Sequence, residues 1–192
     1  FKLLDSSVDA VLISTPNETH SEITKHAILH NKHVLVEKPA VQDPKQLIEL
    51  NTLAEERNVC LTVAYHAAFA KEVVWFLSEW EANPDQYGPL TGFQCLFFDP
   101  YIKQGKLKPQ AIPLQGSWID SGINALSVIE RFLPVGSLQM KEARLSHVAG
   151  IQCSDFQATV DFRFPVTGMK QIGRGQIETN RTLNRKKEND NS

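Results

Sequence analysis

The chain has 192 residues, 42% of them hydrophobic and 22% charged, and its 20 basic and 22 acidic side chains leave a net charge of −2. This composition is typical of a folded globular protein of one or two domains and excludes a disordered or collagen-like chain. Residues 1–169 carry a net charge of −5, which excludes a broad nucleic-acid-binding surface, and no apolar stretch reaches the ~20 residues of a membrane span.

The first 65 residues alternate between strand and helix patterns. Short apolar runs over 8–14, 33–37 and 59–65 predict buried parallel strands. Helical spacing of apolar residues follows Asn17, which can cap a first helix, and Asp43, which precedes a proline at the first helical position of a second. Two strand–helix–strand crossovers with short loops indicate a parallel sheet with helices packed on it.

Beyond residue 66 the pattern changes. Residues 71–80 and 121–133 have helical spacing, whereas 90–98, 137–148 and 156–164 read as strands without crossover helices between them. We therefore expect a smaller, mostly antiparallel α+β domain to follow the parallel α/β part.

The predicted domain boundaries follow from this change. The α/β part spans 1–66 and the α+β part 67–180. Residues 181–192 contain one apolar side chain in twelve, so we expect a solvated tail there.

Polar residues follow all three predicted parallel strands, at Ser14–Asn17, Glu37–Pro39 and Tyr65–His66. Loops are polar wherever they meet water, but ligands bind beyond the carboxyl ends of parallel strands. Three such loops in succession favour a binding site at this edge. The first loop leads into a helix, whose N-terminus suits a phosphate.

Single residues in these loops admit two interpretations. Lys38 follows an apolar strand and precedes a proline; an amine held there can orient a sugar hydroxyl and ease the loss of its proton, or it can simply extend into solvent. Asp120 and Asn124 share a helix face, although Asp120 also suits a helix cap. His66 is either a ligand contact or a core histidine held by a backbone partner.

The histidines and cysteines of the sequence predict neither a metal site nor a disulfide framework. His26, His30 and His33 include a pair at chelating spacing, yet no thiolate or carboxylate pattern accompanies them, so a solvated face is favoured and no metal site is predicted. Three widely spaced cysteines form neither a disulfide framework nor a CxxC site. They indicate a reducing compartment and a cytoplasmic location.

Residues 8–40, VDAVLISTPNETHSEITKHAILHNKHVLVEKPA, resemble the end of the nucleotide-binding domain of the glucose–fructose oxidoreductase, inositol dehydrogenase and rhizopine-catabolism (Gfo/Idh/MocA) family. Thr15–Pro16 and His20 match the family's TPxxxH stretch, and Glu37–Pro39 match its EKP triplet. The resemblance implies the C-terminal part of a Rossmann-like dinucleotide-binding domain over 1–66, followed by an α+β substrate domain. It also makes the Lys38–Pro39 bond a candidate for cis geometry.

The second half narrows the resemblance. YHAAFA (65–70) and SWIDSGINALSVIERFLP (117–134) are similar to the sugar 1-dehydrogenase branch, whose members oxidise L-arabinose or D-galactose at C1. What this implies is an oxidoreductase that uses NAD or NADP and moves hydride from C1 of a sugar to the nicotinamide, giving a lactone.

The resemblance also implies residue roles. Asn124 stands where many family members have histidine, and the 1-dehydrogenase branch shares the asparagine; a carboxamide can only hydrogen-bond the sugar. Proton acceptance then falls to Asp120, with Lys38 as a relay, so these two are the expected catalytic residues. The expected sugar-binding residues are Lys38, His66, Asp99, Asp120 and Asn124. The expected cofactor-binding residues are Ser14, Thr15, Pro16, Asn17, His20, Glu37, Lys38 and Pro39.

One family feature is missing. A G-x-G-x-x-G turn that binds pyrophosphate does not occur, and Gly173-x-Gly175 comes late and precedes no predicted helix. At ~30 residues per βαβ unit about 60 residues are absent, so we expect an N-terminally truncated family member. The alternative is a non-catalytic sugar-binding or regulatory relative that has lost the cofactor site. Expected partners are a small sugar and a second copy bound through the open face of the substrate-domain sheet, with neither nucleic acid nor membrane.

Overall fold

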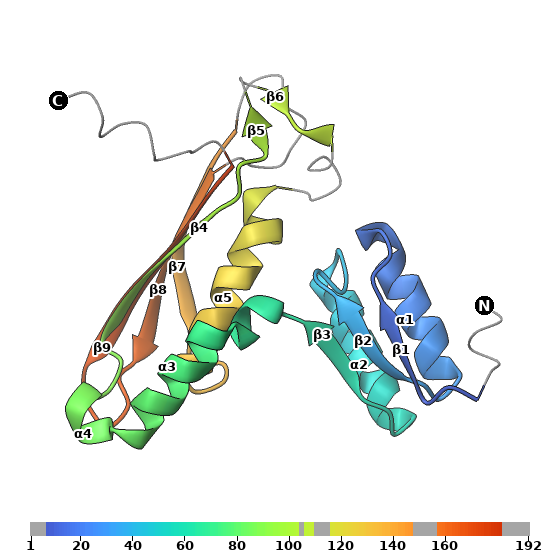
Figure 1. The fold of residues 1–192 in the computed structure, drawn as a ribbon, viewed down its shortest axis with the longest axis horizontal. Coiled ribbons are helices and arrows are strands. Elements are labelled where there is room, and N and C mark those ends of the chain that lie inside the picture. Colours follow the sequence, from blue (N-terminus) through green and yellow to red (C-terminus); the bar gives the residue numbers. More distant parts are fainter. Residues whose placement is uncertain (1–6, 104–105, 110–115, 148–156, 182–192) are drawn as a thin grey trace. The chain divides into compact units, whose positions relative to one another are not determined.

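The structure is a computed structural model that describes residues 7–103, 106–109, 116–147 and 157–181. The chain divides between Tyr65 and His66 into two compact units, called unit 1 and unit 2 below and coloured blue to cyan and green to red in Figure 1. None of the helices in the described ranges combines the length and hydropathy that a membrane span requires.

Unit 1 is a three-stranded parallel sheet in the order β1-β2-β3 with two crossover helices. Its elements are β1 (Ala10–Ile13), the 3-10 turn η1 (Asn17–Thr19), α1 (His20–Leu29), β2 (His33–Glu37), α2 (Pro44–Glu56) and β3 (Leu61–Ala64). The sequence prediction of a parallel sheet with packed helices is confirmed.

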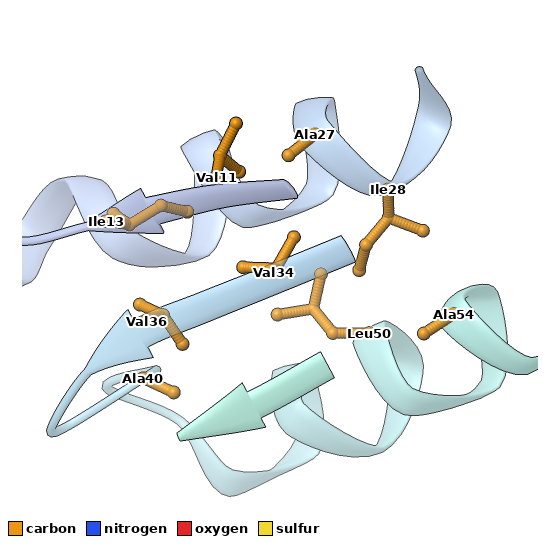
Figure 2. Close-up of a cluster of buried hydrophobic side chains, with 9 residues drawn as sticks. All are labelled: Val11, Ile13, Ala27, Ile28, Val34, Val36, Ala40, Leu50 and Ala54. Carbon is orange, nitrogen blue, oxygen red and sulfur yellow. The ribbon is translucent and has the colours of Figure 1, made fainter. Parts of the chain in front are cut away.

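The core of unit 1 lies between the sheet and both helices (Figure 2). Side chains alternate across a strand, so Val11 and Val34 are buried toward the helices while Leu12 and Leu35, their neighbours in sequence, are 66% and 41% exposed. Each aliphatic side chain buried this way contributes about 1.5–3 kcal/mol of transfer free energy. The cluster comprises Val11, Ile13, Ala27, Ile28, Val34, Val36, Ala40, Leu50 and Ala54.

The two helices of unit 1 begin differently. The Asp43 side chain accepts a hydrogen bond of 3.0 Å from the Lys45 N–H, with Pro44 as the first helical residue, which confirms the predicted cap. Asn17 caps nothing, contrary to the prediction: no side chain caps η1 or α1. Thr19 takes part instead, since its Oγ1 donates to the Pro16 carbonyl over 2.7 Å.

Unit 2 contains a four-stranded mixed sheet in the order β4-β9-β8-β7. The β7/β8 and β8/β9 pairs are antiparallel and the β4/β9 pair is parallel. The elements are η2 (His66–Phe69), α3 (Lys71–Ala82), α4 (Pro84–Tyr87), β4 (Gly92–Phe98), β5 (Ile102–Lys103), β6 (Lys106–Leu107), the π-helical turn η4 (Trp118–Gly122), α5 (Ile123–Ile129), the 3-10 turn η5 (Glu130–Phe132), β7 (Gln139–Ser146), β8 (Gln157–Pro165) and β9 (Ile172–Asn180).

No strand was predicted over the residues of β9, which include two glycines. Gly175 pairs with Phe93 across the β4/β9 ladder, and the Phe93 ring lies where a Cβ of residue 175 would be. Gly173 is covered in the same way by the Phe164 ring. The glycines are therefore strand residues beneath aromatic rings.

One face of this sheet is covered by α5 (Figure 1), and Ala125 packs there with Val160, Phe162 and Ile177. The other face is polar: Arg144 and Gln176 each contact a different oxygen of Asp161 at 2.7 Å. These two donors, Gln176 foremost, hold the pKa of Asp161 below its usual value. With a parallel-sheet unit followed by this α+β unit, the predicted fold class is confirmed.

Candidate functional site

In unit 1 the loops after β1 and β2 lie at the same edge, because the strands are parallel and adjacent. Ser14, Thr15 and Pro16 are exposed there, and Lys38 is half-buried directly after β2. The Lys38–Pro39 bond is cis, as predicted. This edge is the one at which parallel sheets bind ligands.

His20 connects these two loops. Its ring is fully buried, with Nδ1 2.9 Å from the Pro39 carbonyl oxygen and Nε2 2.8 Å from the Thr15 carbonyl oxygen. Both ring nitrogens therefore contact backbone carbonyls of the protein. His20 joins the loop after β1 to the turn after β2.

The first turn after the β1 loop suits part of a dinucleotide. Because no side chain caps η1, its leading backbone N–H groups remain open to acceptors on a ligand. Glu18 adds a negative charge to the same turn, which favours ribose hydroxyls over a phosphate at this point. The Ser14–Asn17 segment and Glu37 thus fit the ribose side of a cofactor.

In unit 2 a second edge brings polar residues together. The parallel strands β4 and β9 end side by side, so Asp99 and Arg181 leave the sheet at neighbouring positions. The Asp99 N–H donates to the Asn180 carbonyl over 3.0 Å, and the Ile102 N–H donates to the Arg181 carbonyl over 2.9 Å. Ser117, just before η4, is joined to Thr179 by a buried hydroxyl contact of 2.8 Å, which fixes η4 to β9.

Arg181 and Asp120 form a buried ion pair at this edge. Arg181 is 0% exposed and Asp120 5%, with 3.7 Å between Arg181 Nη2 and Asp120 Oδ2. The same Nη2 donates to the Gly116 carbonyl over 2.7 Å, whereas Nε and Nη1 have no hydrogen-bond partner. A buried guanidinium needs a counter-charge nearby, and Asp120 supplies it.

The Tyr101 ring lies against the Arg181 guanidinium, with 5.4 Å between the ring centroid and Arg181 Cζ. Burial, followed by the charges of Asp120 and Asp99, raises the pKa of the Tyr101 phenol, and Arg181 opposes this shift. Tyr101 is therefore a neutral hydrogen-bonding group at physiological pH.

Asn124 stands one turn after Asp120 and is 5% exposed. Its Nδ2 donates to the Asp120 backbone carbonyl over 3.3 Å, while its Oδ1 accepts no hydrogen bond. A buried acceptor without a donor is costly, so this oxygen is suited to a ligand hydroxyl. Ser121 donates to Asp99 and holds that carboxylate in place.

The structure corrects two expectations in this region. Arg181, placed by the sequence at the start of a solvated tail, is fully buried; residues 182–192 lie outside the described ranges. Asp120 caps no helix, because Ser117 precedes η4 and Gly122 precedes α5. A signal that could have revealed the burial of Arg181 is the alternation over 172–180, a strand pattern that Arg181 directly follows.

The remaining histidines are placed as follows. His66 is exposed at the start of η2, so the core interpretation is wrong, and η2 packs against α5. His33 accepts a hydrogen bond of 2.9 Å from the Cys60 N–H, and His30 Nδ1 lies 2.8 Å from the His26 carbonyl. Across the described part of the chain no three His, Cys, Asp or Glu side chains are grouped to hold a metal.

Comparison with known proteins supports the dinucleotide-binding interpretation. Residues 2–65 match the Gfo/Idh/MocA family model, described as an oxidoreductase family with an NAD-binding Rossmann fold. The chain is 30% identical over 129 residues to dTDP-3,4-didehydro-2,6-dideoxy-alpha-D-glucose 3-reductase from Actinomadura kijaniata, covering 66% of this chain and 37% of that protein. It is 44% identical over 62 residues to 1,5-anhydro-D-fructose reductase from Ensifer adhaerens, covering 32% and 19%.

Solved structures agree on the fold. GenD2 from gentamicin A biosynthesis, crystallised in complex with NAD, superposes with a TM-score of 0.78 at 20% identity, covering 95% of this chain and 51% of GenD2. The chain thus spans about a third of the first of these relatives and half of GenD2. Residues 2–65 are therefore similar to the NAD-binding Rossmann domain of the Gfo/Idh/MocA oxidoreductase family.

Proposed function

We propose that this chain is part of an NAD- or NADP-dependent aldose 1-dehydrogenase, which removes hydride from C1 of a sugar and yields the lactone. The observation that carries the proposal is the buried group of Asp120, Asn124 and Arg181 at the β4/β9 edge, in which Asn124 Oδ1 has no donor. Polar atoms buried without partners are suited to a ligand rich in hydroxyl groups. The similarity to two sugar reductases, from Actinomadura kijaniata and Ensifer adhaerens, supports this substrate class.

The residues of unit 1 fit the cofactor. Thr15, Pro16 and Asn17 present an uncapped helix start, and Glu37 can accept hydrogen bonds from ribose hydroxyls. A bound nicotinamide supplies the hydride acceptor. The buried His20 ring contacts the backbone carbonyls of Thr15 and Pro39, in the two loops that would hold the cofactor.

The residues of unit 2 fit the sugar. Asn124 Oδ1 accepts a hydrogen bond from one hydroxyl, and Asp99, held by Ser121, accepts from another. His66, exposed beside α5, is proposed as a further hydroxyl contact. Each acceptor restricts the orientation of the ring, and orientation of the reacting carbon is a large part of catalysis.

The C1 hydroxyl must lose its proton as hydride leaves. Two groups are proposed for this step: the Lys38 amine after β2 and the Asp120 carboxylate on η4. A carboxylate accepts a proton directly, and a lysine amine can stabilise the developing negative charge on oxygen or relay the proton. We assign acceptance to Asp120 and the supporting role to Lys38.

The test is oxidation of D-galactose and L-arabinose by the full-length protein with NAD⁺ or NADP⁺, followed by the appearance of reduced cofactor and of lactone. The proposal expects lactone and reduced cofactor in equal amounts with at least one of the two sugars. Cofactor binding without turnover of either sugar would overturn the aldose assignment.

Two variants separate the residue roles. Asp120→Asn removes the proton acceptor and is expected to lower kcat, whereas Asn124→Ala removes a hydrogen bond to bound sugar and is expected to raise KM. Glu49→Gln, an exposed change on α2, is the matched control. An Asp120→Asn protein with unchanged kcat would transfer the acceptor role to Lys38.

A further inference from the structure

His20 joins the two loops that form the carboxyl edge of unit 1. Its nitrogens lie 2.8 Å from the Thr15 carbonyl oxygen, after β1, and 2.9 Å from the Pro39 carbonyl oxygen, after β2. We propose that His20 is a positioning residue: it fixes the loop after β1 to the turn after β2 and thereby sets where Lys38 stands. The proposal deepens the proposed function, because it rests on a role for Lys38 in the reaction.

The chemistry of the two contacts explains why a histidine occupies this position. Both partners are carbonyl oxygens, which accept but never donate, so every hydrogen bond must come from a ring N–H. A ring with one N–H donates to only one of the two carbonyls, whereas a ring with an N–H at both nitrogens donates to both; it is this second form that joins the two loops by hydrogen bonds. The ring is 0% exposed, so water does not reach its two nitrogens.

Lys38 lies between two anchors. On one side Glu37 is paired with Ala64 in the β2/β3 ladder. On the other side the Pro39 carbonyl is held by His20, and Ala40 is buried in the core of unit 1. The position of the Lys38 backbone therefore depends on the contact between the His20 ring and the Pro39 carbonyl.

The loop after β1 is held in the same way. The Thr15 carbonyl is held by His20, and the Thr15 hydroxyl lies 2.7 Å from the Thr19 hydroxyl, which itself donates to the Pro16 carbonyl over 2.7 Å. One imidazole ring therefore fixes both the loop with the proposed cofactor contact, Thr15, and the turn with the proposed catalytic residue, Lys38.

The first experiment needs no ligand. His20→Phe keeps a planar ring without donors, His20→Gln keeps donors at one end only, and His30→Phe is an exposed control at the end of the same helix. Backbone amide hydrogen exchange is measured by NMR in the chain. We expect exchange at Thr15, Lys38 and Ala40 to rise at least about tenfold in His20→Phe and less in His20→Gln, with core strand amides such as Val34 unchanged.

Two results overturn the proposal. One is unchanged exchange in both loops; the other is a uniform rise through the whole of unit 1, which would mean simple destabilisation. If His20→Phe does not fold, the His20→Gln protein decides alone, by whether its faster exchange is confined to the two loops.

The second experiment measures sugar oxidation by the full-length protein. We expect kcat to fall about ten- to a hundredfold in His20→Phe, because misplacement of a catalytic group by about 1 Å costs that much, while the KM for sugar changes less than about threefold. His20→Gln is expected to recover part of the loss, and kcat equal to wild type in His20→Phe would overturn the link to Lys38. A wild-type protein that oxidises neither sugar would refute the proposed function, and the exchange experiment would still decide whether His20 positions the loops.

Discussion

The two carboxyl edges of this protein are built in different ways. In unit 1 the edge consists of exposed loops joined by one buried side chain, His20. In unit 2 the edge consists of opposite charges, Asp120 and Arg181, removed from water together with the amide of Asn124. The first arrangement presents backbone groups to a ligand. The second presents side chains whose orientation is fixed by burial.

This difference has an energetic consequence. An exposed loop can lose one polar contact and substitute water for it, so damage at the unit 1 edge should mainly affect function. A charge that is buried cannot replace a lost partner with water, so removal of one member of the Asp120–Arg181 pair should lower the stability of the fold in addition to any effect on function.

Arg181→Met should be the most destabilising single change. It leaves the Asp120 carboxylate buried opposite an apolar side chain, and breaking a buried pair from one side costs about 3–5 kcal/mol. Chemical denaturation of the variant measures the loss in the free energy of unfolding. The double variant Arg181→Met/Asp120→Asn should recover part of it; equal stability of the single and double variants would show that the pair is not coupled.

Lys38→Ala should leave folding nearly intact and impair the reaction. We expect kcat of the full-length protein to fall by about 10²-fold or more, which corresponds to about 2.7 kcal/mol in the activation free energy. Lys45→Ala, another lysine of unit 1, is the control. A fall of less than threefold with an unchanged melting temperature would place Lys38 outside the reaction.

Gly175→Ala should destabilise unit 2 without touching either edge. The new methyl group would overlap the Phe93 ring, and forcing extra atoms into a packed site costs about 1–3 kcal/mol. Thermal unfolding compares it with Gly136→Ala, which meets no neighbouring atoms but has φ of 72°. If Gly175→Ala, combined with Phe93→Leu, regains no stability, then the ring is not the cause.

Asp43→Ala should have the smallest effect, about 1 kcal/mol, because it removes only the side-chain cap of α2. The free energy of unfolding measures it, and Asp43→Asn should keep most of the stability because an amide oxygen can accept the same bond from the Lys45 N–H. A loss equal to that of alanine would indicate that charge, and not capping, is what matters.

Unit 1 could be predicted almost completely from sequence because its signals are local. The run 33–37 is a strand to the residue, and Asp43–Pro44 marks a helix start that the structure reproduces. Asn17 misled the reading because Thr19 and Pro16 make the local contacts in its place.

Less of the structure of unit 2 could be predicted from sequence, because the contacts that determine it join segments far apart in the chain. No strand was predicted over β9; the rings of Phe164 and Phe93, which cover Gly173 and Gly175, lie on other strands. The burial of Arg181 depends on Asp120, far from it in sequence. Lys38, Asp120 and Asn124 were singled out from their positions after a strand and on one helix face, and the family resemblance supplied their roles. The contacts that these residues make in the structure could not be predicted.

The last strand of the unit 2 sheet, β7, has every residue exposed, pairs with β8 on one side, and slips register between Met140 and Glu142. Within the described ranges no strand pairs with its other side. A free strand edge invites another chain to add to it, and charges and bulges are the features that discourage this. Lys141, Glu142 and Arg144 sit beside the irregularity, so β7 ends the sheet in a form that resists edge-to-edge aggregation.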